Sequence, residues 1–226
     1  MLVAPARRLR GIGSGLFELA AAHLGEHGAL ELRSWSFPDS DGFLQRRGFR
    51  RTRAERMSAI DPRTVDLRAL DRLPPGVRVV TLRELEHRLP EVHAVYAEAA
   101  ADMPADHAET NVPFDEWLVE TIGDPDLASD GSAVVLVGDR IAALSWLKAD
   151  LVRGLAEQEL TGTARAYRRR GLARLAKLAV MRWAAASGVT RVTTGNDATN
   201  AGMLAINHEL GFRPFAVETE WVKPLP

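Results

Sequence analysis

An internal repeat constrains this chain of 226 residues more than any other feature of its sequence. Residues 8–13 read RLRGIG and residues 168–173 read RRRGLA, so both follow the pattern R-x-x-G-x-small. Each motif opens a segment whose apolar residues recur at helical spacing. Each segment ends at a glycine 20 residues after its first arginine, from Arg8 to Gly28 and from Arg168 to Gly188. The repeat therefore predicts two units that share one supersecondary order.

The similarity continues beyond the two helices. A β-prone run follows at residues 29–35 and 189–194, then a second short helix, and then a Gly-Phe-Arg string that ends at Arg50 or Arg213. The copies differ in what precedes them, because the first begins almost at Met1. We therefore predict a partial repeat at residues 1–60, a proline-containing linker at 61–76 and a complete domain at 77–226.

The region before the second motif supplies the remaining elements of that domain. Periodicity predicts strands at residues 77–82, 133–137, 141–148 and 155–163, and helices within 84–101 and around 113–122. With the elements after the motif, the order becomes β, α, α, β, β, β, α, β, α, β. This order predicts an α/β fold with a mixed sheet and helices on its faces.

The composition narrows the classes of partner and location. Lysine plus arginine number 29 against 30 for aspartate plus glutamate, which argues against general attraction to nucleic acid or to membranes. No cysteine is present, so disulfides and thiolate metal sites are excluded. Residues 1–10 lack the order of a signal peptide. We expect a cytoplasmic protein.

The second motif has the form of an anion site. A strand that enters a glycine turn and opens a helix presents several backbone N–H groups at the positive end of the helix dipole. Gly171 allows a phosphate to approach without a Cβ, and Ala173 keeps the first turn narrow. Arg168, Arg169 and Arg170 add positive charge, although three successive arginines are also common on a solvated surface.

Several signals in fixed order resemble the GCN5-related N-acetyltransferase family. They are the strand up to Thr163, the motif at residues 168–173, and then Asn196, Asn200, Asn207 and the Gly211-Phe212 pair. The resemblance covers residues 77–226 and implies acetyl-CoA as the acyl donor, with no metal. It places the pyrophosphate on the loop and the pantetheine between two parallel strands. The implied cofactor-binding residues are Thr161, Thr163, Arg168, Arg169, Arg170, Gly171, Leu172, Ala173, Arg174 and Asn200.

Two carboxylates on the strand before the motif are candidates for general base. Glu157, Glu159, Thr161 and Thr163 are expected to share one face because side chains alternate along a strand. In the cleft, Glu159 or Glu157 would deprotonate the amine directly or through water. The alternative is that this face is only the solvent-facing half of an amphipathic strand.

The residues leave the general acid open. Many family members carry a tyrosine four residues before the Gly-Phe pair, whereas this chain has Asn207. An amide does not act as an acid but can hydrogen-bond the departing sulfur. Coenzyme A would then leave as thiolate, or Tyr167 or His208 would protonate it. The first copy has Leu44 at this position and is expected to have lost catalytic contacts.

The acceptor is a small-molecule or peptide amine whose identity is left open. The resemblance places Asp102, Met103, Asp106, His107 and Trp117 on the acceptor side, where acids would attract a cationic amine or stay solvated. The alternative function is a non-catalytic acyl-CoA-binding or structural and regulatory module. Arginine-rich residues 46–53 suggest nucleic-acid binding, against which the balanced charge counts.

Other site classes are disfavoured, and the first copy needs support. The G-x-G-x-x-G and G-x-x-x-x-G-K-[ST] fingerprints are absent, and no helix carries metal-ligand spacing, so we predict no metal. Residues 1–60 are expected to bury too little surface for independent stability. They are expected to pack against the second domain or to form a homodimer.

Overall fold

The structure is a computed structural model that describes residues 2–103 and 112–225. The strands are β1 (Glu31–Ser36), β2 (Arg50–Ile60), β3 (Val77–Thr81), β4 (Ala133–Val137), β5 (Arg140–Asp150), β6 (Leu155–Thr163), β7 (Arg191–Asp197) and β8 (Arg213–Pro224). The helices are α1 (Ile12–Glu26), α2 (Pro38–Gln45), α3 (Leu89–Ala101), α4 (Phe114–Trp117), α5 (Leu172–Ala186) and α6 (Ala201–Leu210). The described residues also form the 3-10 helices η1 (Pro5–Arg7), η2 (Pro62–Thr64), η3 (Arg68–Asp71), η4 (Arg83–Arg88) and η6 (Arg165–Tyr167), and the π-helix η5 (Leu118–Ile122).

The chain divides into two compact units. The smaller consists of Met1–Ala54 with Val217–Pro226, and the larger of Glu55–Ala216. Strands β2 and β8 contribute to both units, because each runs across a boundary between them. The domain boundaries predicted at residues 60 and 77 remain predictions.

The larger unit is built on a mixed sheet in the order β2-β7-β6-β5-β4-β3. Its neighbouring strands are antiparallel except for β6 and β7, which run parallel. The strands β4 and β5 are buried over most of their length, as expected for apolar strands covered on both faces. The predicted α/β mixed sheet is confirmed.

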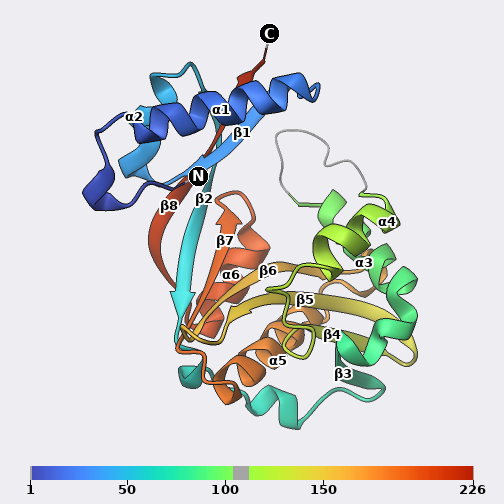
Figure 1. The fold of residues 1–226 in the computed structure, drawn as a ribbon. Helices are drawn as coiled ribbons and strands as arrows, with labels where there is room; N and C mark the ends of the chain where they lie inside the picture. Colours follow the sequence, from blue (N-terminus) through green and yellow to red (C-terminus); the bar gives the residue numbers. More distant parts are fainter. Residues whose placement is uncertain (1, 104–111, 226) are drawn as a thin grey trace. The chain divides into compact units, whose positions relative to one another are not determined.

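Helices cover both faces of this sheet (Figure 1). Helix α5 packs on the face that carries Ala143 and Leu147 of β5. Helices α3 and α4 pack on the other face, with Leu144 and Trp146 of the same strand. The alternation along β5 thus defines an α5 face and an α3 face, and both names are kept below.

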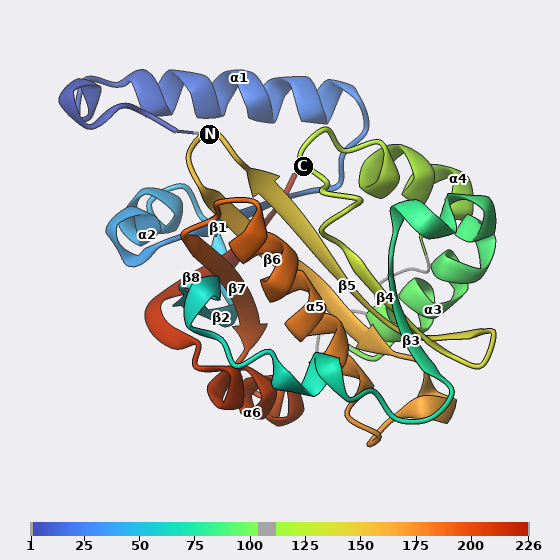
Figure 2. The same cartoon turned by 90° about the horizontal axis from the view of Figure 1, so that it is seen from below.

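The predicted linker, residues 61–76, packs against the core of the larger unit. Residues 61–76 pass along α5, as Figure 2 shows. Pro62 and Leu70 are buried, and Val65, Leu67 and Leu73 pack against the same core. The prolines still break regular structure here, but the apolar residues between them anchor the segment.

The smaller unit has a much smaller core. Strand β1 pairs antiparallel with β8, and β8 neighbours β2, where the Thr52 hydroxyl donates to the buried Glu220 carboxylate at 2.8 Å. Its buried apolar side chains are Leu32, Leu44, Phe49 and Trp221. Within the described residues, none of α1 is fully buried, although Phe17 and Ala21 pack against this core.

The two copies exchange their last strands. Strand β2 ends the first copy but pairs with β7 of the second, from Glu55 opposite Asp197 to Ile60 opposite Val192. Strand β8 ends the second copy but pairs with β1 of the first. The sequence predicted the repeated elements correctly and said nothing of this pairing.

Candidate active site

A splay between two parallel strands is the main feature of the candidate site. The parallel pairing of β6 and β7 ends at Glu157 opposite Thr193, although the strands continue to Thr163 and Asp197. Beyond this point β5 occupies one edge of β6, and the other edge has no recorded strand partner among the described residues. A strand edge of this kind offers backbone N–H and C=O groups to an extended ligand.

The loop between β6 and α5 has the geometry predicted for an anion site. Gly171 is the N-cap of α5 with φ of 74°, and Arg169 also has a positive φ of 60°. Within the described part of the chain, no backbone carbonyl accepts the N–H groups of residues 169–174. A Cβ at Gly171 would meet no atom within 4 Å, so this side of the loop is open. The start of α5 therefore fits a phosphate group.

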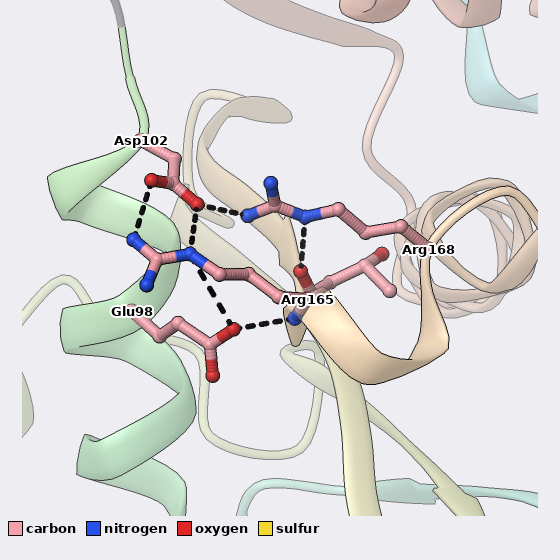
Figure 3. Close-up of polar contacts among 5 residues, drawn as sticks. Glu98, Asp102, Arg165 and Arg168 are labelled. Atoms are coloured by element: carbon pink, nitrogen blue, oxygen red, sulfur yellow. Dashed lines mark hydrogen bonds and ion pairs between the residues drawn. The ribbon is translucent and has the colours of Figure 1, made fainter.

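The Arg168 side chain contacts groups of the protein itself. Figure 3 shows the Asp102 carboxylate between the guanidinium groups of Arg165 and Arg168. Arg165 contacts Asp102 at 2.6 and 2.8 Å, and Arg168 also donates to the Thr163 carbonyl at 3.1 Å. The hydrogen bonds from Arg165 and Arg168 hold the pKa of Asp102 well below its usual range. Asp102, expected to attract the acceptor, instead fixes the loop to the end of α3.

The expected common face of Glu157, Glu159, Thr161 and Thr163 is wrong. Thr161 lies opposite Ser145 and Gln158 opposite Leu147, so two residues of β6 face one residue of β5. This β-bulge reverses the alternation. The Ser145 hydroxyl bonds the Thr161 hydroxyl at 2.8 Å and accepts from Gln158 at 2.9 Å, which places all three on the α5 face.

The two glutamates therefore lie on the α3 face, apart from the threonine side chains. The Glu159 carboxylate contacts the Lys148 ammonium at 3.0 Å, and Lys148 also contacts Asp124 at 3.0 Å. Burial lowers the pKa of Lys148, but its bonds to Glu159 and Asp124 outweigh this and raise it. Glu159 is thus anchored beside a cation, and both glutamates are exposed.

The start and end of α6 place two asparagines near the splay. The Asn200 side chain caps α6 by accepting the Met203 N–H at 3.2 Å. Asn207 is 3% exposed and donates to Asn196 of β7 at 2.5 Å, while its own oxygen has no partner within the described residues. His208, a candidate acid, is exposed on the same helix. Tyr167, the other candidate, is half-buried under the Arg170 guanidinium, 5.4 Å from its ring centroid.

That these residues line the acceptor side stays a prediction, and the structure shows only where the described ones lie. Trp117 and Trp146 are buried in an aromatic cluster with Tyr96 and His93 on the α3 face. Met103 lies just after α3 and is exposed, and Asp106 and His107 lie outside the described residues. Among the residues that are described, no three metal-ligating side chains gather.

Sequence reasoning missed three residues of the site. Ser145 and Gln158 lie in predicted strands but carry no signal that singled them out, and the sequence did not link Lys148 to Glu159. A polar residue inside an otherwise apolar run, such as Ser145 between Leu144 and Trp146, was the available signal. Lys148 had no comparable signal, because a register across two strands decides its contact.

Comparisons with known proteins fix the fold. A scan against models of protein families found no match. The tandem GNAT protein of the clavulanic acid biosynthesis pathway superposes with a TM-score of 0.73 at 22% identity. The match covers 99% of this chain and 73% of the tandem protein's chain. The chain has the GCN5-related N-acetyltransferase fold. The resemblance inferred from the motif and the asparagines is confirmed.

Further relatives agree with this fold. GCN5-related N-acetyltransferases from Sphaerobacter thermophilus and Kribbella flavida have TM-scores of 0.67 and 0.65 at 18% and 19% identity, with 98% and 99% of this chain and 70% and 77% of theirs covered. A mycothiol acetyltransferase of Nocardioides sp. is 28% identical over an alignment 230 residues long, which covers 94% of this chain and 75% of that protein. No described helix is both long and apolar enough to span a bilayer.

Proposed function

We propose that this protein is an N-acetyltransferase that moves an acetyl group from acetyl-CoA to a primary amine. The observation that carries the proposal is the opening between parallel strands β6 and β7 directly beside the glycine-capped start of α5. Such an arrangement suits a ligand with an extended, amide-containing arm and a pyrophosphate. The mycothiol acetyltransferase and the tandem GNAT protein support the acyl-transfer chemistry by their names.

Residues of the loop would bind the donor's phosphates. The N–H groups of residues 169–174 supply donors, and Arg169 and Arg170 supply charge. Arg168 contributes by holding the loop to Asp102 rather than through a phosphate contact. The Asn200 amide group, which already caps α6 through its oxygen, would donate its N–H to the pantetheine arm.

The bulge on β6 would stabilise charge on the reacting carbonyl. Glu159 and Leu160 together face the single residue Trp146, so one backbone N–H lacks a regular ladder partner. A preorganised N–H aimed at the thioester carbonyl oxygen stabilises the negative charge that develops there. The amine nitrogen forms its bond to the acyl carbon as the carbon–sulfur bond breaks.

Proton transfer would use a carboxylate of the α3 face. Glu159 is the first candidate to accept the proton from the amine, and Glu157 is the second. Lys148 keeps the Glu159 side chain beside β5. The sulfur leaves as thiolate near the Asn207 amide or takes a proton from Tyr167 or His208, as the sequence suggests.

Binding and turnover together test the proposal. Calorimetry with acetyl-CoA should show saturable binding, and coenzyme A release in the presence of a panel of small-molecule and peptide amines should show turnover. Glu159→Gln should lower kcat at neutral pH and leave the acetyl-CoA affinity nearly unchanged. Binding without turnover of any amine would favour the alternative, a non-catalytic acyl-CoA-binding or regulatory module.

A further inference from the structure

We infer that Gln158 limits the donor's acyl group to acetyl by closing the narrow end of the splay between β6 and β7. The inference rests on the proposed acyl transfer and adds to it a residue that selects the donor. It starts from the side chains just beyond Glu157 and Thr193, the last pair that joins the two strands. The first residues past this pair are Gln158 on β6 and Thr194 on β7.

Both side chains lie on the α5 face. Ala156 of β6 and Val192 of β7 belong to the core under α5, and alternation places Gln158 and Thr194 on the same face. The donor reaches the splay from this face, because the glycine-capped start of α5 lies on it and Leu210 of α6 packs in the same core. The two glutamates that are candidates for general base lie on the α3 face, so donor and acceptor approach from opposite faces.

Exposure falls toward the narrow end of the splay. Thr161 and Asn196, further along the two strands on the same face, are half-buried. Gln158 is 1% exposed and Thr194 is 2% exposed. Solvent therefore reaches the strands at Thr161 and Asn196 but not at the two residues below them, which form the closed end of the splay.

The length of the donor brings its acyl group to this end. Coenzyme A has about twelve bonds between its phosphate ester oxygen and its sulfur, which span roughly the length of four extended residues, ~14 Å. Counting back by that length along β6 from Thr163, where the strand ends before the loop to α5, leads to Glu159 in the bulge. With the thioester at the bulge, the carbons beyond an acetyl group would meet Gln158.

A hydrogen bond holds the Gln158 side chain in place. Its Nε2 donates to the Ser145 hydroxyl at 2.9 Å, and this hydroxyl also bonds the Thr161 hydroxyl at 2.8 Å. The Gln158 Oε1 is buried and accepts no hydrogen bond within the described residues. A buried amide oxygen without a donor lowers stability, a cost that an apolar residue of similar size would avoid. A longer acyl chain would meet this fixed side chain and cover its oxygen without donating to it.

The test compares donors that differ only in acyl length and needs no acceptor. Calorimetry measures Kd for acetyl-CoA, butyryl-CoA and coenzyme A. We expect the wild-type protein to bind acetyl-CoA at least about tenfold more tightly than butyryl-CoA. Gln158→Ala opens the closed end and should bring the two Kd values to within about threefold by tightening butyryl-CoA binding, with little change for coenzyme A. Gln158→Met keeps the side-chain volume and should keep the wild-type preference.

A second variant and a control make the outcomes distinct. Thr194→Ala opens the same end from β7 and should weaken the preference in the same direction, so it serves where Gln158→Ala does not fold. Gln45→Ala removes an exposed amide at the end of α2 and should leave all three Kd values unchanged. If wild-type protein fails to bind acetyl-CoA, the proposed function is wrong. If it binds acetyl-CoA but binds butyryl-CoA equally well, or if the folded opening variant keeps the wild-type preference, only the role of Gln158 is wrong.

Discussion

The two copies of the repeat have the same local loop and very different helices. Leu9 and Arg169 both have φ of 60°, and Gly11 and Gly171 have φ of 79° and 74°. The guanidiniums of Arg8 and Arg168 each donate to a carbonyl five residues earlier, both at 3.1 Å. The helices that follow are each 15 residues long, yet α5 has nine buried residues and α1, as described, has none.

The difference shows that local sequence sets the turn and that the surrounding sheet sets the burial. Positive φ at a glycine and at the residue two before it needs no distant partner. The strands β3 to β6 cover α5, whereas the described residues give α1 only the small core around Phe17. The predictions below test this contrast.

The strand exchange gives the largest expected effect. A fragment of residues 73–226 lacks β2 and the buried Pro62 and Leu70, so the edge of β7 that pairs with residues 55–60 becomes exposed and part of the core at α5 is lost. We expect this fragment to aggregate or to lose cooperative thermal unfolding, while a fragment of residues 50–226 retains both. A soluble, cooperatively unfolding 73–226 fragment would show that β2 contributes little.

The glycine of the second loop has the next largest effect. Valine at Gly171 must adopt a left-handed backbone at a cost of about 1–2 kcal/mol and places a branched Cβ on the open side of the loop. Acetyl-CoA affinity measured by calorimetry should fall about tenfold or more. Gly171→Asn should keep most of the affinity because asparagine tolerates this backbone. Gly11→Val should leave turnover unchanged if only the second copy is catalytic.

Equivalent helix positions should differ in their contribution to stability. Leu172 is 3% exposed and Ile12, its counterpart, is 43% exposed. We expect Leu172→Ala to lower the free energy of unfolding by about 2–4 kcal/mol and Ile12→Ala by under about 1 kcal/mol. Urea titration followed by circular dichroism measures both. Equal losses would mean that α1 is covered as well as α5.

The close packing of α3 on β6 predicts a smaller change in stability when a single methyl group is added there. A Cβ at Gly162 would lie 2.2 Å from the Ala99 Cβ, so Gly162→Ala should destabilise the protein by about 1–3 kcal/mol. Gly202 in α6 has open space around it, and Gly202→Ala should stabilise by up to about 1 kcal/mol. Differential scanning calorimetry should shift Tm in opposite directions for the two variants.

The smallest expected effect is on the pH dependence of stability, which a carboxylate contact at the second loop should influence and the first loop should not. The bonds from Arg165 and Arg168 lower the pKa of folded Asp102, so their stabilisation is present above the unfolded carboxyl pKa of about 4 and is lost as pH falls below it. Asp102→Asn should flatten the acid limb of unfolding midpoint against pH. No recorded carboxylate contacts Arg8 in the described part of the first loop, so Arg8→Gln should leave that limb unchanged.

The sequence by itself determined the repeated loop–helix–strand–helix–strand order, the mixed sheet and the glycine-capped loop before α5. Each follows from short-range signals: glycine at positive φ, periodic apolar residues and helix ends. The strand β6 was predicted with its exact observed bounds, Leu155–Thr163. The resemblance to the acetyltransferase fold rested on the same local features in fixed order.

Only the tertiary structure decided which side chains meet. One extra residue in β6 puts the side chains of Glu159 and Thr161 on opposite faces of the sheet. The pairing of β2 with β7 brings the Glu55 carboxylate over Gly195. The packing of α3 beside the loop brings Asp102, at the end of α3, into an ion pair with Arg168. These contacts join residues far apart in the chain through strand register and helix packing, which depend on the whole core and leave no periodic signal in any short segment.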